Sequence, residues 1–144
     1  MSSVASAAGP IYCAAKPGNE ALRLDALHSY AILDTPREPA FDDITRLAAM
    51  ICQTPIAVVN LIDSERQWFK SEIGLGTRET PLATSLCAHA LLEDDLLLVP
   101  DTREDPRFAC NPLVTGAERL HFYAGALLKT SDGLALGTVC VLDR

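Results

Sequence analysis

The chain has 144 residues, of which 49% are hydrophobic and 22% charged, an ordinary globular composition. Such a length forms one core of domain size, and the composition excludes a disordered tail or a fibrous repeat. Twelve basic and nineteen acidic residues give a net charge of -7, a field that repels phosphate backbones and anionic lipid. We therefore expect no nucleic-acid partner. We also expect no direct membrane insertion, because the apolar runs are shorter than the ~20 residues that a membrane helix needs.

Residues 1–18 consist mostly of small side chains and end in a Lys-Pro-Gly sequence, so we expect a flexible leader without chemistry of its own. They lack the basic and apolar regions of a secretory signal, which favours a cytoplasmic location. The five cysteines are scattered without a Cys-x-x-Cys pair, which indicates reduced thiols and not a disulfide framework. Cys52 and Cys140 lie in apolar patterns and are interpreted as small core residues.

Two helices are predicted first. Apolar residues recur at helical spacing over residues 19–33, and an Asp-Thr-Pro sequence ends that helix. A second helix is predicted to begin near Pro39, since proline is tolerated in a first turn, and to stop before Pro55. One face of this second helix carries Ile44, Leu47, Ala48 and Ile51.

The spacing then changes to that of strands. Residues 56–62 form a β-branched apolar run, an Asp-Ser-Glu turn follows, and residues 67–73 complete a predicted β-hairpin. Apolar residues occupy both faces of these strands, so we expect both faces of the sheet to be covered.

The second half of the chain mixes loops, a helix and three strands. Residues 74–81 predict a polar loop, Thr84 or Ser85 can cap a helix that runs to about Glu93, and residues 96–99 predict a strand. Residues 101–112 form a long connection with one helical turn near Pro106. Strands at 120–129 and 134–142 follow, joined by a turn that ends in Asp-Gly. This order predicts an α+β domain around a central antiparallel sheet.

Several short segments of the sequence are weak evidence for a protein family when each is taken alone, but their joint order and spacing are specific. They are Asp34-Thr35-Pro36, Phe41-Asp42, Arg66-Gln67-Trp68-Phe69, Ser85-Leu86-Cys87-Ala88-His89, Asp105-Pro106-Arg107-Phe108, Asn111-Pro112, Phe122-Tyr123-Ala124-Gly125 and Leu136-Gly137-Thr138. Together they resemble the GAF domain, of the type found at the input end of bacterial sensor histidine kinases and diguanylate cyclases, over residues 19–144.

The resemblance implies a PAS-related sheet with a helical dimerisation layer on one face and a small-molecule pocket, roofed by helix and loop, on the other. It also implies a C-terminal signalling helix that leads to an output domain and that the chain is expected to lack. We therefore expect residues 19–144 to be a sensory domain, non-catalytic by itself, that forms a homodimer and binds an unidentified small molecule. A histidine kinase is the expected parent and a diguanylate cyclase the next. The residues expected to link pocket and dimer partner are Leu22, Leu27 and Leu33.

Six side chains are candidates for ligand binding: Trp68, Cys87, His89, Asp101, Phe108 and Tyr123. Cys87 and His89 are two residues apart, about 200° around a helix, so they cannot converge on one metal ion. We expect Cys87 to pack inward and His89 to form hydrogen bonds near Ser85 and Glu93. Tyr123 is the strongest polar candidate, because a buried phenol needs a partner that a ligand can supply.

The candidate Asp101 belongs to a charged cluster with Arg103, Asp105 and Arg107. One interpretation is a pocket roof whose arginines bind an anionic ligand in bidentate fashion. The favoured interpretation is structural: Asp105 caps the turn that Pro106 begins, and the charges stay solvated.

Two other functions remain open. Cys110, in a Phe-Ala-Cys-Asn setting, and Cys87 resemble the nucleophilic and resolving cysteines of free methionine-(R)-sulfoxide reductases, which are GAF proteins; the third cysteine of that family is missing here. The other possibility is a vestigial pocket in a domain that only dimerises. A bilin is disfavoured because Ala88 separates Cys87 from His89, and the cyclic-nucleotide signature is absent from the sequence. No cofactor is assigned.

Overall fold

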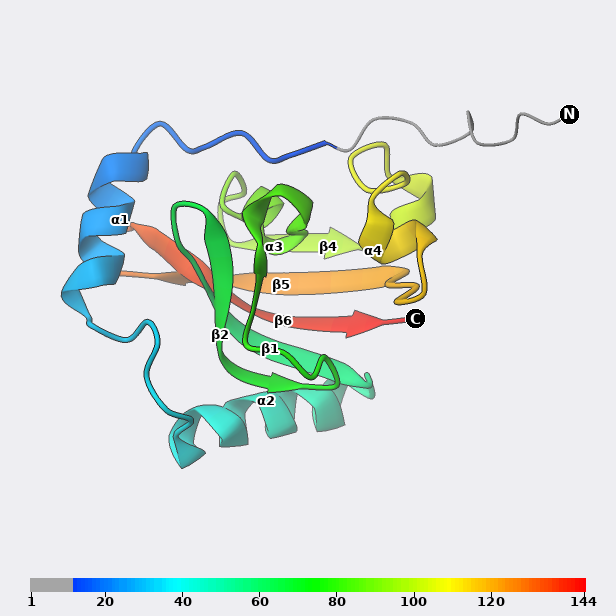
Figure 1. The fold of residues 1–144 in the computed structure, drawn as a ribbon, viewed down its shortest axis with the longest axis horizontal. Helices are drawn as coiled ribbons and strands as arrows, with labels where there is room; N and C mark the ends of the chain where they lie inside the picture. The colour runs from blue at the N-terminus through cyan, green and yellow to red at the C-terminus, as the bar shows by residue number, and fades with distance from the viewer. Residues whose placement is uncertain (1–11) are drawn as a thin grey trace, which may run out of the picture.

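A computed structural model describes residues 12–144 and confirms an α+β arrangement around an antiparallel sheet (Figure 1). The strands lie in the order β3-β2-β1-β6-β5-β4, and each neighbouring pair is antiparallel. Their bounds are β1 (Ile56–Ile62), β2 (Arg66–Ile73), β3 (Glu79–Pro81), β4 (Leu96–Val99), β5 (Phe122–Lys129) and β6 (Ala135–Asp143). The short strand β3 lies within the segment that was expected to be a loop.

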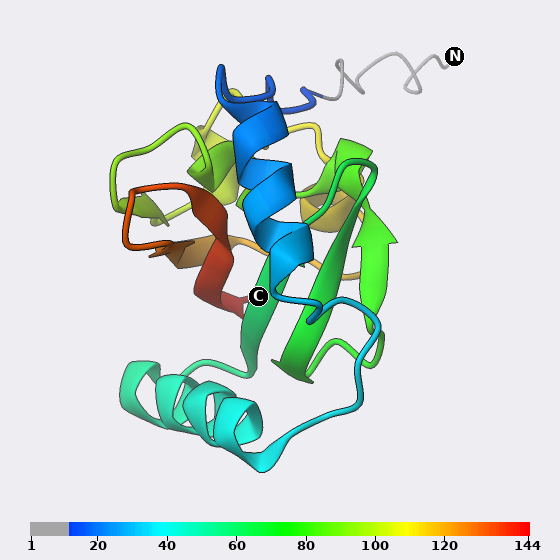
Figure 2. The same cartoon turned by 90° about the vertical axis from the view of Figure 1, so that its left-hand side faces the viewer.

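Two longer helices cover one face of the sheet and short helical turns cover the other. α1 (Glu20–Ser29) and α2 (Pro39–Cys52) contact β1, β2 and β6, and Figure 2 shows them at a steep angle to each other. The opposite face carries α3 (Cys87–Ala90), α4 (Pro112–Thr115) and the segments around them. Among residues 12–144 there is no helix with the length and apolarity needed to cross a membrane.

The expected leader lies partly outside the described residues, because only residues 12–18 are placed. These residues have no helix or strand, and they touch the domain at several points. The Lys16 ammonium donates to the carbonyl of Ser64 at 2.7 Å, and the Cys13 thiol donates to the carbonyl of Ala83 at 3.3 Å. The flexibility of the leader stays a prediction.

The apolar side of α2 faces away from the sheet. Ile44, Leu47 and Ile51 are exposed, the last two to 56% and 72%. Thr45 is the residue of α2 that is fully buried, and its hydroxyl lies 2.8 Å from the hydroxyl of Ser71 on β2. Cys52, expected in the core, is exposed, so that prediction is wrong. The hydrophobic stripe therefore marks a free surface of the domain.

α1 ends at Ser29, four residues before the end that the apolar pattern over residues 19–33 predicts. Leu27 is fully buried against Leu61 and Trp68, whereas Leu22 is 63% exposed. A residue that is fully buried inside its own domain cannot contact a dimer partner. The expected role of Leu27 at a dimer interface is therefore wrong.

Strand register decides which side chains face the short helices. Directly opposite residues share a face of an antiparallel pair, and β1 pairs with β6 so that Val58 is opposite Cys140 and Asn60 opposite Thr138. Gly137 permits this pairing, because a Cβ built there would lie 1.9 Å from the carbonyl oxygen of Asn60. The main hydrophobic core therefore forms between this face of the sheet and α3.

The last hairpin and the helix after Ser85 follow the sequence pattern with one difference in length. Residues 130–133 form the predicted turn, in which Gly133 adopts a φ of +87°. Ser85 accepts a hydrogen bond from the amide of Ala88, as predicted for a cap, but α3 ends at Ala90 and not near Glu93. Cys140 is buried in the core, as expected.

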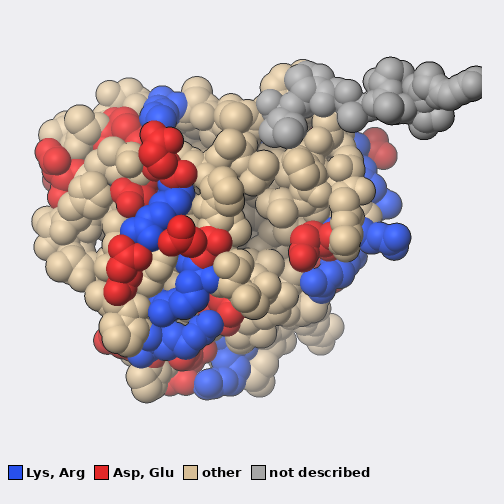
Figure 3. Space-filling view, viewed as in Figure 1, with Lys and Arg blue, Asp and Glu red and all other residues tan. Residues whose placement is uncertain are grey.

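Charged side chains on the face shown in Figure 3 are interspersed, with basic and acidic groups next to each other. Arg66 illustrates the pattern, because its guanidinium contacts Asp34 at 2.7 Å, Glu79 at 2.8 Å and Asp63 at 3.4 Å. Such mixed surface pairs contribute little stability each.

Candidate functional site

A cavity of about 120 Å³ lies between the sheet and the segments that cross above it. Strands β1, β2 and β6 supply its floor, and the loop before β3, the turn before α3 and the region around α4 supply its roof. The lining residues are Val58, Gln67, Phe69, Leu75, Thr77, Thr80, Leu86, Cys87, Leu113, Glu118, Leu120, Cys140 and Leu142. This mainly apolar wall with few polar groups is typical of a small-molecule pocket.

The polar groups on one side of the cavity are already bonded to one another. The Gln67 amide nitrogen donates to the Thr80 hydroxyl at 2.7 Å, and the Ser85 hydroxyl donates to the Gln67 amide oxygen at 2.8 Å. This chain of hydrogen bonds connects β2, β3 and the start of α3. It fixes the wall and leaves little unsatisfied polarity on this side for a ligand.

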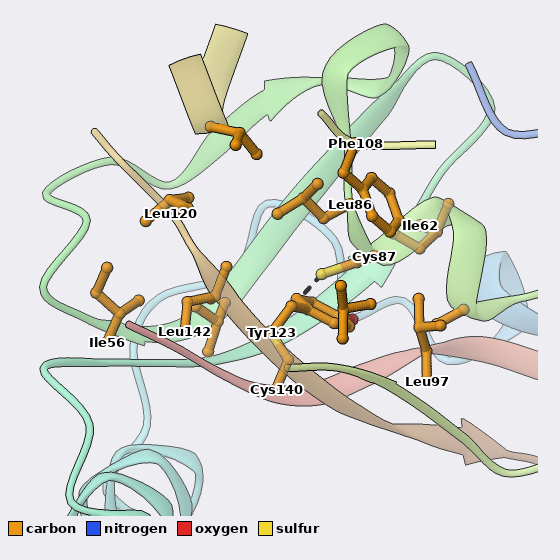
Figure 4. Packing of buried hydrophobic residues seen from close by; sticks show 14 of the residues in the cluster. Ile56, Ile62, Leu86, Cys87, Leu97, Phe108, Leu120, Tyr123, Cys140 and Leu142 are labelled. Carbon is orange, nitrogen blue, oxygen red and sulfur yellow. Dashed lines mark hydrogen bonds between the residues drawn. The ribbon is translucent and has the colours of Figure 1, made fainter. Parts of the chain in front are cut away.

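Two thiols and an amide form a buried cluster in the cavity wall. Cys87 Sγ on α3 lies 3.6 Å from Cys140 Sγ on β6, a contact drawn in Figure 4. The Asn60 amide nitrogen donates to Cys87 Sγ at 3.2 Å and to the Thr138 hydroxyl at 2.6 Å. The hydrogen bond between the thiols lowers the pKa of Cys87, although burial opposes this shift, and raises the pKa of Cys140.

Tyr123 is one of two buried polar side chains with an unsatisfied atom among residues 12–144, the other being Asn60 through its amide oxygen. The Tyr123 side chain is fully buried, and its hydroxyl has no hydrogen-bond partner among residues 12–144. Burial raises the pKa of Tyr123 well above its usual value, so the group remains a phenol. The hydroxyl lies over Gly125, where an added Cβ would be 2.2 Å away, and Gly125 pairs with Cys140. The unpaired phenol is therefore next to the thiol cluster.

His89 and Phe108 lie together in the roof, outside the residues that line the cavity. Their rings pack edge to face with centroids 4.8 Å apart. The expected partners of His89, Ser85 and Glu93, are replaced by the carbonyl of Tyr12, 3.1 Å from His89 Nε2. Burial lowers the pKa of His89. His89 thus points away from Cys87, and residues 12–144 contain no cluster of three or more His, Cys, Asp or Glu placed to hold a metal.

Trp68 and Asp101 lie away from the cavity. Trp68 packs with Leu27 and Leu61 on the α1 face of the sheet, whereas its neighbour Phe69 lines the cavity. Because side chains alternate between the two faces of a strand, the sequence predicts that either Trp68 or Phe69 faces the pocket, but it does not say which of the two. Asp101 is at the surface, where it accepts hydrogen bonds from the amide and the guanidinium of Arg103.

Asp105 has the structural role that the sequence favoured. Its carboxylate accepts from the backbone amide of Arg107 at 2.9 Å and pairs with that guanidinium at 2.8 Å. The arginine hydrogen bond lowers the pKa of Asp105. Both arginines of the cluster thus engage their neighbouring aspartates through Nε and Nη2, which agrees with the structural interpretation of the cluster.

The cysteines expected to cooperate in a reductase are not brought together. Cys110 is half-buried in the loop before α4 and does not line the cavity, whereas Cys87 contacts Cys140. Sequence reasoning missed Gln67 and Cys140 as wall residues. The signal for Gln67 was available, because it shares a strand face with Phe69; the signal for Cys140 required the β1–β6 register.

Comparison with known proteins agrees with this geometry. The model of the family described as "GAF domain" matches residues 36–144. The cyclic di-GMP phosphodiesterase PA2567 of Pseudomonas aeruginosa is 42% identical over 128 residues, which cover 89% of this chain and 22% of that relative. The chain therefore spans less than a quarter of the length of that curated relative.

Solved structures share the fold at low sequence identity. The GAF domain from Acinetobacter phosphoenolpyruvate-protein phosphotransferase is 14% identical with a TM-score of 0.59, covering 85% of this chain and 77% of that one. Free methionine-R-sulfoxide reductase from Neisseria meningitidis is 17% identical with a TM-score of 0.56, covering 93% and 80%. Such likeness shows the fold alone. Together with the match of the family over most of the sequence, it establishes that this chain belongs to the GAF domain family.

Proposed function

We propose that this chain is a small-molecule-sensing regulatory domain of a bacterial signal-transduction protein, cytoplasmic and non-catalytic by itself. The observation that carries the proposal is the mainly apolar cavity of about 120 Å³ between the sheet and its roof. The unpaired hydroxyl of Tyr123 beside the thiol cluster supports it, because a buried phenol without a partner is costly unless something else satisfies it. Tyr123 itself is not among the lining residues, so a ligand would satisfy this hydroxyl only on entering beyond the present cavity wall.

The size and lining of the cavity favour a small, mostly apolar ligand. An apolar cavity of about 150 Å³ accommodates benzene, so a molecule of roughly that bulk fits. Larger ligands occupy sites of about 300 Å³ and more, and a dinucleotide exceeds the space available here. Glu118, an exposed lining residue whose carboxylate lies 3.8 Å from the Arg144 guanidinium, is the acidic group available to a ligand with a hydrogen-bond donor at one end.

The parent protein that we propose turns over cyclic di-GMP. The sequence favoured a histidine kinase, with a diguanylate cyclase next, whereas the curated relative is named as a cyclic di-GMP phosphodiesterase. Because this chain corresponds to 22% of that relative, the catalytic activity of such a parent would reside in other parts of it. The GAF domain would regulate that output and would not bind the dinucleotide in its cavity.

Regulation requires two arrangements that the ligand distinguishes. A ligand shifts an equilibrium only by its different affinity for the two states. The roof is built from short turns around α3 and α4, while the floor belongs to the continuous sheet. A movement of the roof in response to a ligand therefore breaks fewer strand-to-strand hydrogen bonds than a movement of the floor. We propose that a homodimer formed through the exposed apolar side of α2 passes this change to the parent.

Native mass spectrometry of the freshly purified chain tests the ligand. The expected result is an excess mass that disappears on denaturation and that is absent from a Leu113→Trp variant, whose larger side chain fills the cavity. Leu98→Trp, on the exposed edge strand β4, is the matched control and should keep the excess mass. The same excess mass over the chain's own mass in the wild type and in Leu113→Trp, or no excess mass in the wild type, would contradict the proposal for the purified domain.

A further inference from the structure

Two of the five free cysteines face each other inside the molecule, across the gap between α3 and β6 (Figure 4). The Sγ atoms of Cys87 and Cys140 are 3.6 Å apart, and neither side chain is more than 5% exposed. Both nevertheless line the cavity, so a small solute that enters it reaches both thiols at once. The remaining cysteines, at positions 13, 52 and 110, are exposed or half-buried and do not line the cavity.

The surroundings make the two thiols unequal. The Asn60 amide donates to Cys87 Sγ at 3.2 Å, whereas its distance to Cys140 Sγ is 3.8 Å. The contact between the thiols lowers the pKa of Cys87 and raises the pKa of Cys140. Because the thiolate is the nucleophile, Cys87 is the thiol that attacks and Cys140 the one that stays protonated until it is needed.

The elements that carry the two thiols differ in how firmly they are held. Cys140 lies in β6, which pairs with β1 on one side and β5 on the other. Cys87 begins the single-turn helix α3, which is flanked by turns. A disulfide needs a sulfur–sulfur distance of about 2.05 Å, so the thiols must approach by about 1.5 Å. The roof can supply this movement while the sheet stays in place.

We propose that Cys87 and Cys140 form a peroxide-oxidisable dithiol site, in which hydrogen peroxide that enters the cavity converts the pair into a disulfide. In the first step the Cys87 thiolate attacks one peroxide oxygen, the O–O bond breaks and hydroxide leaves. The sulfur is thereby oxidised to a sulfenic acid and the peroxide is reduced. In the second step the Cys140 sulfur attacks the Cys87 sulfur, the S–O bond breaks, and the hydroxyl group leaves as water with the proton of Cys140.

The disulfide ties the roof of the cavity to its floor. It gives the domain a redox input at the same cavity that we propose as the ligand site, and it needs no other ligand to be bound. Peroxide is little larger than a water molecule, which needs roughly 15 Å³, so it is much smaller than this cavity of about 120 Å³. Failure of the dithiol chemistry would therefore leave the proposed ligand binding untouched, and the reverse also holds.

A variant with Cys13, Cys52 and Cys110 all replaced by serine isolates the buried pair without changing the core. After treatment with hydrogen peroxide and alkylation of free thiols under denaturing conditions, we expect a mass about 2 Da lower, no alkylation, and full reversal by dithiothreitol. Alkylation of both thiols after peroxide treatment would overturn the proposal. A gain of about 32 Da that peptide mapping places on Cys87, the mark of a sulfinic acid without a disulfide, would overturn it as well; mapping is needed because oxidation of the two methionines adds the same mass to the whole chain.

Peptide mapping of the oxidised wild type separates this pair from the reductase arrangement. A cross-linked peptide that joins Cys87 to Cys140 is expected. A peptide that joins Cys87 to Cys110 would overturn the proposal and favour the reductase. As a second variant, Cys140→Ser in the triple-serine chain should accumulate sulfenic acid on Cys87, trapped by dimedone, and a folded variant without that adduct would also contradict the assigned roles.

Discussion

At the scale of single residues, Gly137 sets how closely strands β1 and β6 approach each other. The same pairing places Asn60 beside Cys87. His89 is half of an edge-to-face pair in the roof and must stay neutral there, because burial lowers its pKa. Gly137 and His89 each lead to a stability experiment.

Gly137→Ala should destabilise the domain by about 1–3 kcal/mol or more, because the new methyl group meets the backbone oxygen of Asn60 and the strands must separate. Urea unfolding followed by circular dichroism measures the change. Gly18→Ala is the matched control, since nothing lies within 4 Å of its added Cβ, and it should be nearly neutral. Equal stability of the two variants would show that the close contact at Gly137 is not a real constraint.

Stability should decline as the pH falls below the ordinary histidine pKa of about 6.5, because unfolded His89 takes up a proton more readily than the buried side chain does. The contribution is complete above that value and is lost as the pH falls through the lower pKa of the folded state. Melting temperatures measured between pH 8 and about pH 5 test this. His89→Gln keeps a donor for the carbonyl of Tyr12 and should flatten the curve; an unchanged slope would remove His89 as its cause.

At the scale of elements, α1 is joined to the sheet by a buried cation as much as by apolar contacts. The Arg23 side chain is 1% exposed and donates to the carbonyls of Ile62 and Ala135 at 2.8 and 3.4 Å. It is also paired with Glu20 at 2.8 Å. The helix thus bridges the end of β1 and the start of β6.

Arg23→Met should cost about 3 kcal/mol, because it leaves two carbonyls and a carboxylate without their donor. The measurement is the free energy of unfolding in urea. Arg46→Met on α2 is the control: Arg46 is mostly exposed, its pair with Asp43 is solvated, and its loss should change stability by less than about 0.5 kcal/mol. A similar loss in both variants would contradict the bridging role of Arg23.

The helices and strands also show which features of the fold the sequence pattern can predict. All strands except the short β3 were predictable, since β-branched runs and the turn before Leu134 leave few alternatives. Helix faces were not, because periodicity shows that Ile44, Leu47 and Ile51 share a side and cannot show whether that side meets the sheet or the solvent. The bulge of β1 with β2, where the register shifts after Val59, has no sequence signal of its own.

The candidate site was predictable in the same uneven way. Of the six candidate residues, Cys87 lines the cavity, and Tyr123 is buried outside the lining; their roles in binding stay predictions. The cavity itself depends on how the segments before β3 and around α4 cross the sheet, and these segments contain little regular structure. Local patterns say little about such long-range packing, and the partnership of Cys87 with Cys140 could not be inferred from their separation in the sequence.

At the scale of the whole molecule, the exposed apolar side of α2 is the feature that single-chain folding leaves unexplained. Ile44, Leu47 and Ile51 recur at helical spacing and all face solvent. A second copy of the chain can cover this stripe helix against helix, in keeping with the homodimer that we propose.

Leu47→Glu should convert a dimer into a monomer, because a charge replaces a leucine in the middle of the stripe. Sedimentation velocity measures the change in mass. Leu98→Glu, an equally exposed leucine on the edge strand β4, should remain dimeric and controls for the added charge. A wild type that sediments as a monomer, or a dimeric Leu47→Glu variant, would refute an interface through α2.

The central claim is that the cavity between sheet and roof binds a small molecule, and chemical-shift mapping by NMR tests it most directly. The titration uses apolar fragments of about the bulk of benzene, a size matched to the cavity. We predict saturable shifts for at least one fragment, concentrated at the amides of Phe69, Leu86, Leu120 and Cys140. Shifts confined to other surfaces, or no shift with any fragment, would contradict the claim.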